Sequence, residues 1–460
     1  MVRRPGMSLG CSTCRRRKIK CDETQPKCRR CLIDGRDCSG PVSGNVFLAS
    51  DVRNPRKSTR IENNTKTSPQ RETKTISSDT LTISNANFFM VPQASDLCQT
   101  QLVSCFLLFF GRTAMNKGKS QSWLVSCASD VDFSLLKGWD ASISAAALAL
   151  YVTNSQNWNA VMQFYEWYDR GIQYQHELLR NRAGYLSFEE TERHVVYTIL
   201  LAYCDAIIPT SRNSFSQHVK AAVALLCTVG PYACQYDRLH GIFLTLRSHM
   251  VHICLTESIT TLLASATWTD IPFHNKSKRP LDFVIDFLLQ LPSSESLPSY
   301  SSNIITEDSN INVLISLWLY VTETYSDCLC GNQLLTESET AEKHPFWDYV
   351  ALRIDYRDSE VAVTLALYSL SWILVLANTP HSDLITTKYE LIAAHCNTIL
   401  TAAAFIDSID AGCGYIRIVH PLRAIVLHSD NSGQKERAVF YLKKWGSKIQ
   451  LLRTACLDLQ

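Results

Sequence analysis

Six cysteines near the start of the chain are the residues most suited to chemistry. They form two groups with the spacing Cys-x2-Cys-x6-Cys, namely Cys11, Cys14, Cys21 and Cys28, Cys31, Cys38. A Cys-x2-Cys pair directs two sulfur atoms to one metal ion, and a third cysteine six residues later folds back to it. Two tetrahedral zinc ions offer eight coordination positions, so six thiolates suffice if two of them are shared. The spacing therefore predicts a compact cluster of two Zn²⁺ ions, whose binding supplies most of the folding free energy of the segment.

Basic residues are distributed unevenly between the two cysteine groups. Five cations and no acid lie between the second and third cysteines, namely Arg15, Arg16, Arg17, Lys18 and Lys20. The second group instead balances three arginines against two aspartates, namely Arg29, Arg30, Arg36, Asp34 and Asp37. Lysine and arginine displace condensed counterions from phosphate, and they are suited to guanine O6 and N7 in the major groove. The first group is therefore predicted to contact double-stranded DNA.

Residues 8–40 resemble the binuclear zinc cluster DNA-binding domain of fungal transcription regulators, because all six cysteines fall at the spacing of that family. Pro26 also matches a proline in the family's loop between the halves. The resemblance implies that Cys11 and Cys28 bridge the two metal ions. It also implies that the end of the first short helix, around Arg17 and Lys18, enters the major groove over a CGG-like triplet. We expect Lys18 and Arg17 to contact base edges and the other cations mostly to hold phosphate, namely Arg15, Arg16, Lys20, Arg29 and Arg30.

Other interpretations of the six cysteines are weaker. Three disulfides in a secreted peptide allow 15 connectivities, but residues 1–10 contain no apolar stretch of the kind found in signal peptides. Metal storage needs no basic arm, and zinc modules of the RING or LIM type usually include histidine and longer loops. The alternative that remains is an adaptor, a zinc-stabilised module whose basic arm binds an acidic protein partner.

Charge and composition divide the 460 residues into three parts. Residues 1–80 hold 18 Lys and Arg against 8 Asp and Glu, whereas residues 81–460 hold 27 against 35. We predict a zinc-cluster DNA-binding domain at 1–40 and a flexible basic linker at 41–92, which is too poor in large apolar residues to fold. A large all-α domain is predicted at 93–460. No leucine-type heptad repeat is visible between 39 and 90, which weakens the expectation of a symmetric dimer on paired CGG triplets.

The all-α prediction rests on periodicity. Apolar residues recur every three or four positions in Trp158–Leu179, Glu189–Ile208, Phe215–Val229 and Leu239–Leu263. Ser187 and Glu190 form a capping box before the second run, and the whole pattern indicates roughly a dozen helices. The stretch Phe164–Gly230 is similar in hydrophobic texture to the fungal-specific helical regulatory domain that follows the cluster in many regulators. That resemblance implies effector response and partner contact rather than catalysis, and we expect His218 to be a surface or core residue.

Two further segments have two interpretations each. Val361–Ala377 is 17 residues long without a charge, near the lower limit of a membrane span, but a helix buried on all sides explains it as well. Near the C-terminal end, seven residues follow a heptad seam, namely Ala438, Leu442, Trp445, Ile449, Leu452, Cys456 and Leu459. The seam either forms a homodimer through the helical domain or packs on its own domain. The broad apolar face around it favours the second interpretation, as burial is favoured for the first segment.

No sequence motif of an enzyme is present. The chain lacks Gly-x-Gly-x-x-Gly, P-loop, Gly-x-Ser-x-Gly and His-Glu-x-x-His motifs. His249 and His252 are interpreted as a satisfied surface or core pair. We therefore predict no enzyme and no membrane protein. The sequence instead indicates a nuclear, sequence-specific transcription regulator of RNA polymerase II genes, with double-stranded DNA and transcription machinery or co-regulators as its partners.

Overall fold

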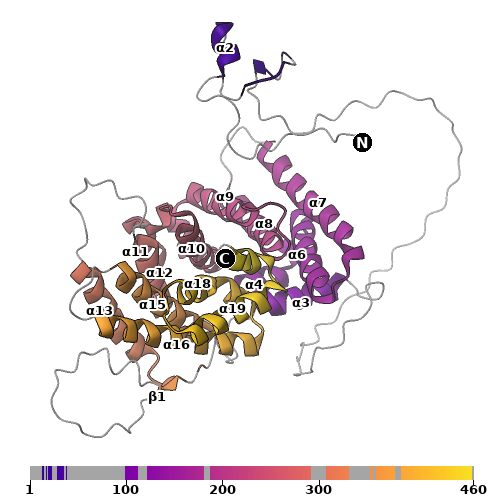
Figure 1. Ribbon diagram of the computed structural model, residues 1–460. Coiled ribbons are helices and arrows are strands. Elements are labelled where there is room, and N and C mark those ends of the chain that lie inside the picture. The colour runs from indigo at the N-terminus through magenta and orange to yellow at the C-terminus, as the bar shows by residue number, and fades with distance from the viewer. Residues whose placement is uncertain are drawn as a thin grey trace, which may run out of the picture. The chain divides into compact units, whose positions relative to one another are not determined.

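The computed structural model describes residues 13–14, 17, 19–22, 28–35, 38, 99–111, 122–180, 187–291, 307–330, 353–354, 356, 359–378 and 385–457. The chain divides into two units, Met1–Asn85 and Ala86–Gln460 (Figure 1). The first unit contains the cysteine segment, where the structure describes helix α2 (Arg29–Ile33) and a helical turn at Thr13 and Cys14. The predicted linker at 41–92 lies outside the described residues.

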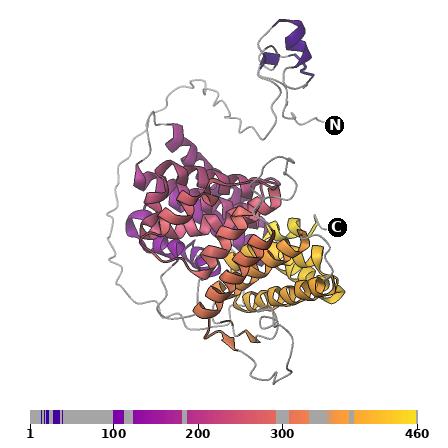
Figure 2. The ribbon, with the colours of Figure 1, turned by 90° about the vertical axis from the view of Figure 1, so that its left-hand side faces the viewer.

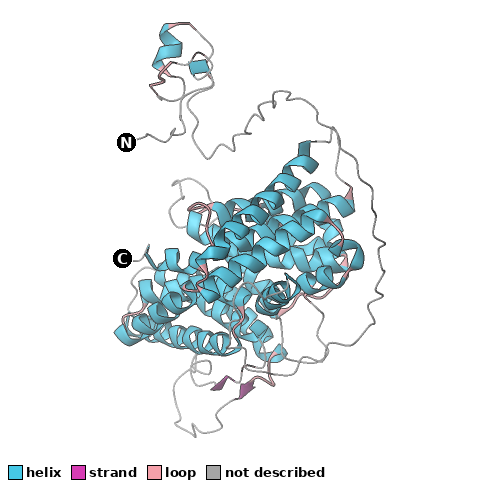
Figure 3. Cartoon of the chain, turned by 90° about the vertical axis from the view of Figure 1, so that its right-hand side faces the viewer, coloured by secondary structure: helices cyan, strands magenta, loops and turns pink. Residues whose placement is uncertain are grey.

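The second unit, called the helical body below, is built almost entirely of helices (Figure 3). The α-helices are α3 (Gln99–Gly111), α4 (Trp123–Ser129), α5 (Val131–Ser134), α6 (Lys137–Ser155), α7 (Val161–Arg180), α8 (Phe188–Ile207), α9 (Ser214–Val229), α10 (Asp237–Glu257), α11 (Ala266–Asp270), α12 (Pro280–Gln290), α13 (Glu307–Thr324), α15 (Ser359–Asn378), α16 (Ile385–Ile409), α17 (Gly412–Arg417), α18 (Val419–His428), α19 (Ser432–Gly446) and α20 (Gln450–Leu457). Four 3₁₀ turns accompany them: η1 (Trp158–Ala160), η2 (Pro231–Gln235), η3 (Leu262–Ala264) and η4 (Ile271–Phe273).

The prediction of an all-α body is confirmed, with one small exception. Strands β1 (Leu329–Cys330) and β2 (Arg353–Ile354) pair antiparallel, with Leu329 opposite Ile354. Strands of two residues are too short to show an alternating pattern, so the sequence did not predict them. The described part of the body has 17 α-helices rather than about a dozen, because several, such as α5 and α17, are only one or two turns long.

Two almost fully buried helices organise the body. In both α8 and α15, 15 of the 20 residues are buried. Helix α8 packs against α6, α7 and α9, whereas α15 packs against α12, α13, α16 and α18. In Figure 2 the purple to magenta helices α3 to α9 gather on one side of the body, and the orange to yellow helices α15 to α19 on the other. Helix α10 contacts elements of both groups, and a single hydrophobic core runs through them.

The ends of the helices follow local chemistry. At the start of α8, the Ser187 hydroxyl accepts the backbone N–H of Glu190, whose carboxylate accepts the backbone N–H of Ser187, which confirms the predicted capping box. Helix α10 ends at Glu257, before the predicted end at Leu263, because Ser258 adopts a left-handed conformation with φ 52°.

The uncharged segment 361–377 forms most of α15. By length and composition alone, this helix and the stretch Lys388–Ile409 of α16 are apolar enough to cross a membrane. However, 83% of the apolar window of α15 and 56% of that of α16 are buried inside the body. Their burial supports the interpretation as core helices.

The C-terminal heptad seam is not one continuous helix. Helix α19 ends at Gly446 and α20 begins at Gln450, so the chain bends in the middle of the seam. Five seam residues are buried in the core, namely Ala438, Leu442, Trp445, Ile449 and Leu452. The side chains of Cys456 and Leu459 lie outside those described. The seam thus packs on its own domain. The alternative prediction, a dimer interface, is wrong for these five residues, because the helical body itself already buries their side chains.

Candidate metal centre and nucleic-acid interface

Short turns of the backbone position the sulfur atoms of the first unit. Cys14 lies in a helical turn that continues through a hydrogen bond from the backbone N–H of Ile19 to the Cys14 carbonyl, at 3.1 Å. Cys28 is the N-cap of α2, and its sulfur accepts the backbone N–H of Cys31 at 3.4 Å. The backbone N–H of Cys28 in turn points to the sulfur of Cys38, also at 3.4 Å. The second cysteine group is therefore folded around its own sulfurs.

The distances between the sulfur atoms match a shared metal ion. The Sγ of Cys14 lies 3.7 Å from that of Cys28 and 3.8 Å from that of Cys31, and all three side chains are fully buried. Four sulfurs that each lie about 2.3 Å from a tetrahedral zinc ion are about 3.8 Å apart. A disulfide needs an S–S distance of about 2.05 Å, and none of the five described cysteines of this segment forms one. The arrangement fits zinc ligation and disfavours the disulfide interpretation.

Cys28 belongs to two sets of potential metal ligands. One set is Cys14, Cys28 and Cys31, and the other is Cys21, Asp22 and Cys28, with the ligand atoms of each set within 4.8 Å of one another. A sulfur common to two sets is what a two-zinc cluster with six thiolates requires, so the residues present fit the group. Cys11, the other expected bridge, lies outside the described residues.

The predicted DNA-binding residues are only partly described. Lys20, Arg29 and Arg30 are exposed, as a phosphate-binding role needs, while Arg15, Arg16 and Lys18 lie outside the described residues. Arg17 is engaged within the protein, because its Nη1 donates to Asp34 Oδ2 at 2.6 Å. This ion pair raises the pKa of the Arg17 guanidinium, mainly through the hydrogen bond to Asp34.

Sequence reasoning did not find the contacts of two acidic residues in this unit, Asp22 and Asp34. Besides Asp34, Asp22 accepts the backbone N–H of Arg29 through its Oδ2 at 3.0 Å and so holds the start of α2. No local sequence signal marked Asp22, because it lies seven residues before Arg29 and Cys28 holds the N-cap position of α2.

Comparison with known proteins decides the family of this unit. Residues 9–43 match the model of the fungal Zn(2)-Cys(6) binuclear cluster domain. This segment belongs to that family. The family description names two zinc ions and six cysteines, which confirms the prediction of two Zn²⁺. The described cysteines would hold such ions through thiolate, which gives zinc a structural rather than a catalytic task.

Several curated relatives share the binuclear cluster domain. The chain is 57% identical over 37 residues to the aspercryptin biosynthesis cluster-specific transcription regulator atnN of Emericella nidulans, which covers 8% of this chain and 6% of that protein. It is 46% identical over 44 residues to transcription factor lfc1 of Flammulina velutipes, covering 10% and 16%. It is 61% identical over 31 residues to the transcriptional regulatory protein moc3 of Schizosaccharomyces pombe, covering 7% and 6%. These names belong to regulators rather than enzymes, in agreement with the prediction, and the chain aligns with only a small part of each. No solved structure matches the chain.

The histidines singled out in the helical body serve its packing. His218 Nε2 lies 3.2 Å from Asp205 Oδ2 and 3.0 Å from the hydroxyl of Tyr168, which donates to the same carboxylate at 2.9 Å. Burial alone raises the pKa of Asp205, but the bonds from His218 and Thr210 bring it below its ordinary value. This cluster joins α7, α8 and α9 and agrees with the expected structural role of His218.

His249 and His252 are core residues, but they are not fully satisfied. In each ring Nδ1 is buried with no hydrogen-bond partner among the described residues. His252 packs on His420 with ring centroids 4.8 Å apart, and Phe215 lies edge-on to both His249 and His252. The prediction of a satisfied pair is therefore wrong for the two Nδ1 atoms, which are buried without a hydrogen bond from the described residues.

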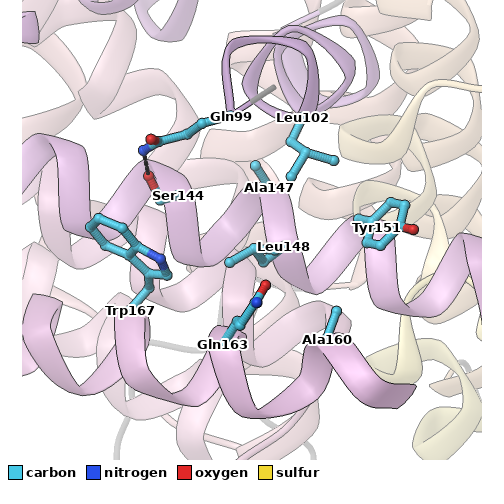
Figure 4. A pocket seen from close by; sticks show the side chains of 9 residues that line it. All are labelled: Gln99, Leu102, Ser144, Ala147, Leu148, Tyr151, Ala160, Gln163 and Trp167. Carbon is cyan, nitrogen blue, oxygen red and sulfur yellow. Dashed lines mark hydrogen bonds between the residues drawn. The ribbon is translucent and has the colours of Figure 1, made fainter. Parts of the chain in front are cut away.

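A cavity of about 180 Å³ lies between α3, α6 and α7. Figure 4 shows the nine side chains that line it, from Gln99 and Leu102 to Gln163 and Trp167. The Gln99 amide donates to Ser144 at 2.6 Å across one end. The Tyr151 phenol is the one ionisable group among the nine lining residues, so they offer no acid–base pair.

Proposed function

We propose that this protein is a sequence-specific, DNA-binding transcription regulator that acts on RNA polymerase II genes in the nucleus. Its six cysteines, Cys11, Cys14, Cys21, Cys28, Cys31 and Cys38, hold two Zn²⁺ ions. The observation that carries the proposal is the buried sulfur cluster with tetrahedral edge distances, beside the exposed cations Lys20, Arg29 and Arg30. A cluster of this kind stiffens a basic turn that has almost no apolar core of its own. The names of the relatives, which are transcription regulators or factors, support the same function.

In this proposal the basic residues have separate tasks. Lys18, with Arg17, reads the base edges of a CGG-like triplet, while Arg15, Arg16, Lys20, Arg29 and Arg30 mostly hold phosphate. Phosphate contacts fix the register of a protein on DNA, and base contacts specify the sequence. The helical body regulates the cluster domain through co-regulators or a second copy of the chain.

Selection of bound sites from random duplexes tests the function with the full chain loaded with zinc. We expect one motif with a CGG-like triplet and an affinity that falls steeply with salt. Lys18→Ala should cost about 1–3 kcal/mol on the best site and relax the base preference there, whereas Lys20→Ala should weaken binding to all sequences alike. Equal losses on specific and random DNA for both variants contradict these roles. A failure to select any motif, with no salt-dependent DNA binding, favours the adaptor with an acidic protein partner.

Metal content tests the ligand assignment separately. Because Cys28 lies in both ligand sets, Cys28→Ser should lower the zinc content below two ions per chain. Cys396 is equally buried but lies in α16 of the helical body, so Cys396→Ser is the matched control and should keep both ions. Two zinc ions retained in Cys28→Ser would contradict the assignment.

A further inference from the structure

An ion pair connects the two halves of the binuclear cluster domain. Arg17 belongs to the basic stretch after Cys14, and Asp34 is the C-cap of α2 in the second half. The 2.6 Å contact between them leaves the side chains 34% and 35% exposed. One of the five cations of the first half is therefore held by an acid of the other half, on a surface that is partly exposed to solvent.

The Arg17–Asp34 pair has little to contribute to the stability of the fold. Water and salt screen an exposed ion pair strongly, and metal binding already supplies the folding free energy of such a module. The Asp34 carboxylate is also not required to terminate α2. The backbone N–H of Asp34 bonds to the carbonyls of Arg30 and Leu32, and the next residue, Gly35, adopts the left-handed conformation with φ 60° that ends many helices. A carboxylate at a helix C-terminus is even unfavourable. The pair thus calls for an explanation other than stability.

The pair alters how the first half meets DNA. A cation strengthens binding to any sequence when it neutralises a phosphate and releases a counterion. Arg17 is already neutralised by Asp34, so it has to give up this partner before it gains a phosphate. By contrast, Lys20 and Arg30 are exposed and form no ion pair within the described part of the chain. Guanidinium has five N–H donors, so the bond from Nη1 leaves other donors of Arg17 for a base edge.

We propose that Asp34 is a selectivity-determining residue that holds Arg17 away from the phosphates. It lowers the affinity for random DNA relative to the specific site and keeps the guanidinium oriented for a base. The proposal rests on the DNA-binding function proposed above.

The test measures affinities of the full, zinc-loaded chain for its selected site and for a random duplex of equal length, between 50 and 200 mM salt. Asp34→Asn should steepen the slope of log K against log[salt] on random DNA by about 0.9, the value for one added phosphate contact. The increase in random-DNA affinity over the unmodified protein is then about 3.5-fold larger at 50 mM than at 200 mM salt. The ratio of specific to random affinity falls. Arg17→Gln should leave the random-DNA slope unchanged, whereas Lys20→Gln, the matched control, should reduce it by about 0.9.

The single variant Arg17→Gln separates positioning from a simple sum of charges, because the double variant Arg17→Gln with Asp34→Asn has the net charge of the unmodified protein. If charges merely add, Arg17→Gln reduces the random-DNA slope by about 0.9, as Lys20→Gln does, and that result overturns the proposal. If Asp34 acts through Arg17, the double variant loses the gain of Asp34→Asn. A gain that persists there overturns the proposal, as does an Asp34→Asn protein with unchanged slope and ratio. Zinc content equal to that of the unmodified protein verifies that each variant carries an intact cluster. If the unmodified protein binds no DNA, the proposed function itself fails; if it binds and Asp34→Asn changes nothing, only the role of Asp34 fails.

Discussion

Acidification is expected to destabilise the helical body through its buried histidines. His249 and His252 in α10 and His395 in α16 are each at most 9% exposed. Burial lowers the pKa of His249 to about 3, with a further contribution from Arg417, and that of His252 to about 4, with one from Arg423. Burial likewise lowers the pKa of His395 to about 3. Glu257 is the acid that opposes the shift at His252.

The sign and size of the effect follow from proton linkage. An unfolded histidine has a pKa of about 6.5, so between that value and the folded pKa only the unfolded chain takes up the proton. The stability from these rings is therefore complete above about pH 6.5 and is lost as the pH falls toward 3–4. At pH 5 each histidine costs about 2 kcal/mol, or about 6 kcal/mol for the three. Domains have total stabilities of about 5–15 kcal/mol, so this loss is a large fraction.

Urea unfolding of the full chain at pH 7 and pH 5, followed by the helical circular-dichroism signal, measures this loss. His395→Leu removes one titrating ring from the core and should reduce the difference between the two pH values by about 2 kcal/mol. His176 lies on the exposed surface of α7, and His176→Gln controls for the loss of a histidine as such. A difference below about 1 kcal/mol in the unmodified protein, or an undiminished difference in His395→Leu, refutes the reasoning.

Three further outcomes are expected. A strong chelator should remove both zinc ions and abolish DNA binding, while the circular-dichroism signal of the helical body persists; unchanged DNA affinity of the metal-free protein contradicts this. Trp445→Ala should lower the free energy of unfolding by about 3–5 kcal/mol, because Trp445 is 1% exposed and stacks on Tyr415 with ring centroids 4.4 Å apart. Phe440→Ala, at an exposed site of the same helix, should change that free energy by at most about 0.5 kcal/mol. Gly412→Ala should cost about 1–3 kcal/mol, because the added methyl group overlaps the ring of Phe109; an unchanged thermal midpoint would contradict that packing.

The features that depend on local spacing were predictable from the sequence. The cysteine spacing predicted the two-zinc cluster because ligands a few residues apart converge on one ion whatever the rest of the chain does. The Ser187–Glu190 capping box was predictable for the same reason, since both partners lie within one turn. The Arg17–Asp34 pair was not, because it depends on how one half of the domain folds over the other.

The C-terminal seam shows a different limit of the sequence. An apolar stripe has the same period whether a second copy or the chain's own core covers it, so Leu442 and Trp445 fit both interpretations equally well. The break between Gly446 and Gln450 also escaped prediction, because the apolar steps continue across it. Only the tertiary structure distinguishes the two cases.

The aromatic contacts of Tyr415 bear on the order in which the protein matures during synthesis. Tyr415 joins Phe109 of α3, at 5.9 Å between ring centroids, to Trp445 of α19, at 4.4 Å. Helix α3 packs on α4 and α6, which follow it closely in the chain, but the Phe109 ring meets Tyr415 only when almost the whole chain has left the ribosome, about 20 to 70 seconds later at common elongation rates. The cysteine segment needs only its own residues and metal, so it is able to load zinc during that interval. A nascent chain stalled before α17 would then already carry a metal-loaded N-terminal unit ahead of a helical body that still lacks the Tyr415 contacts.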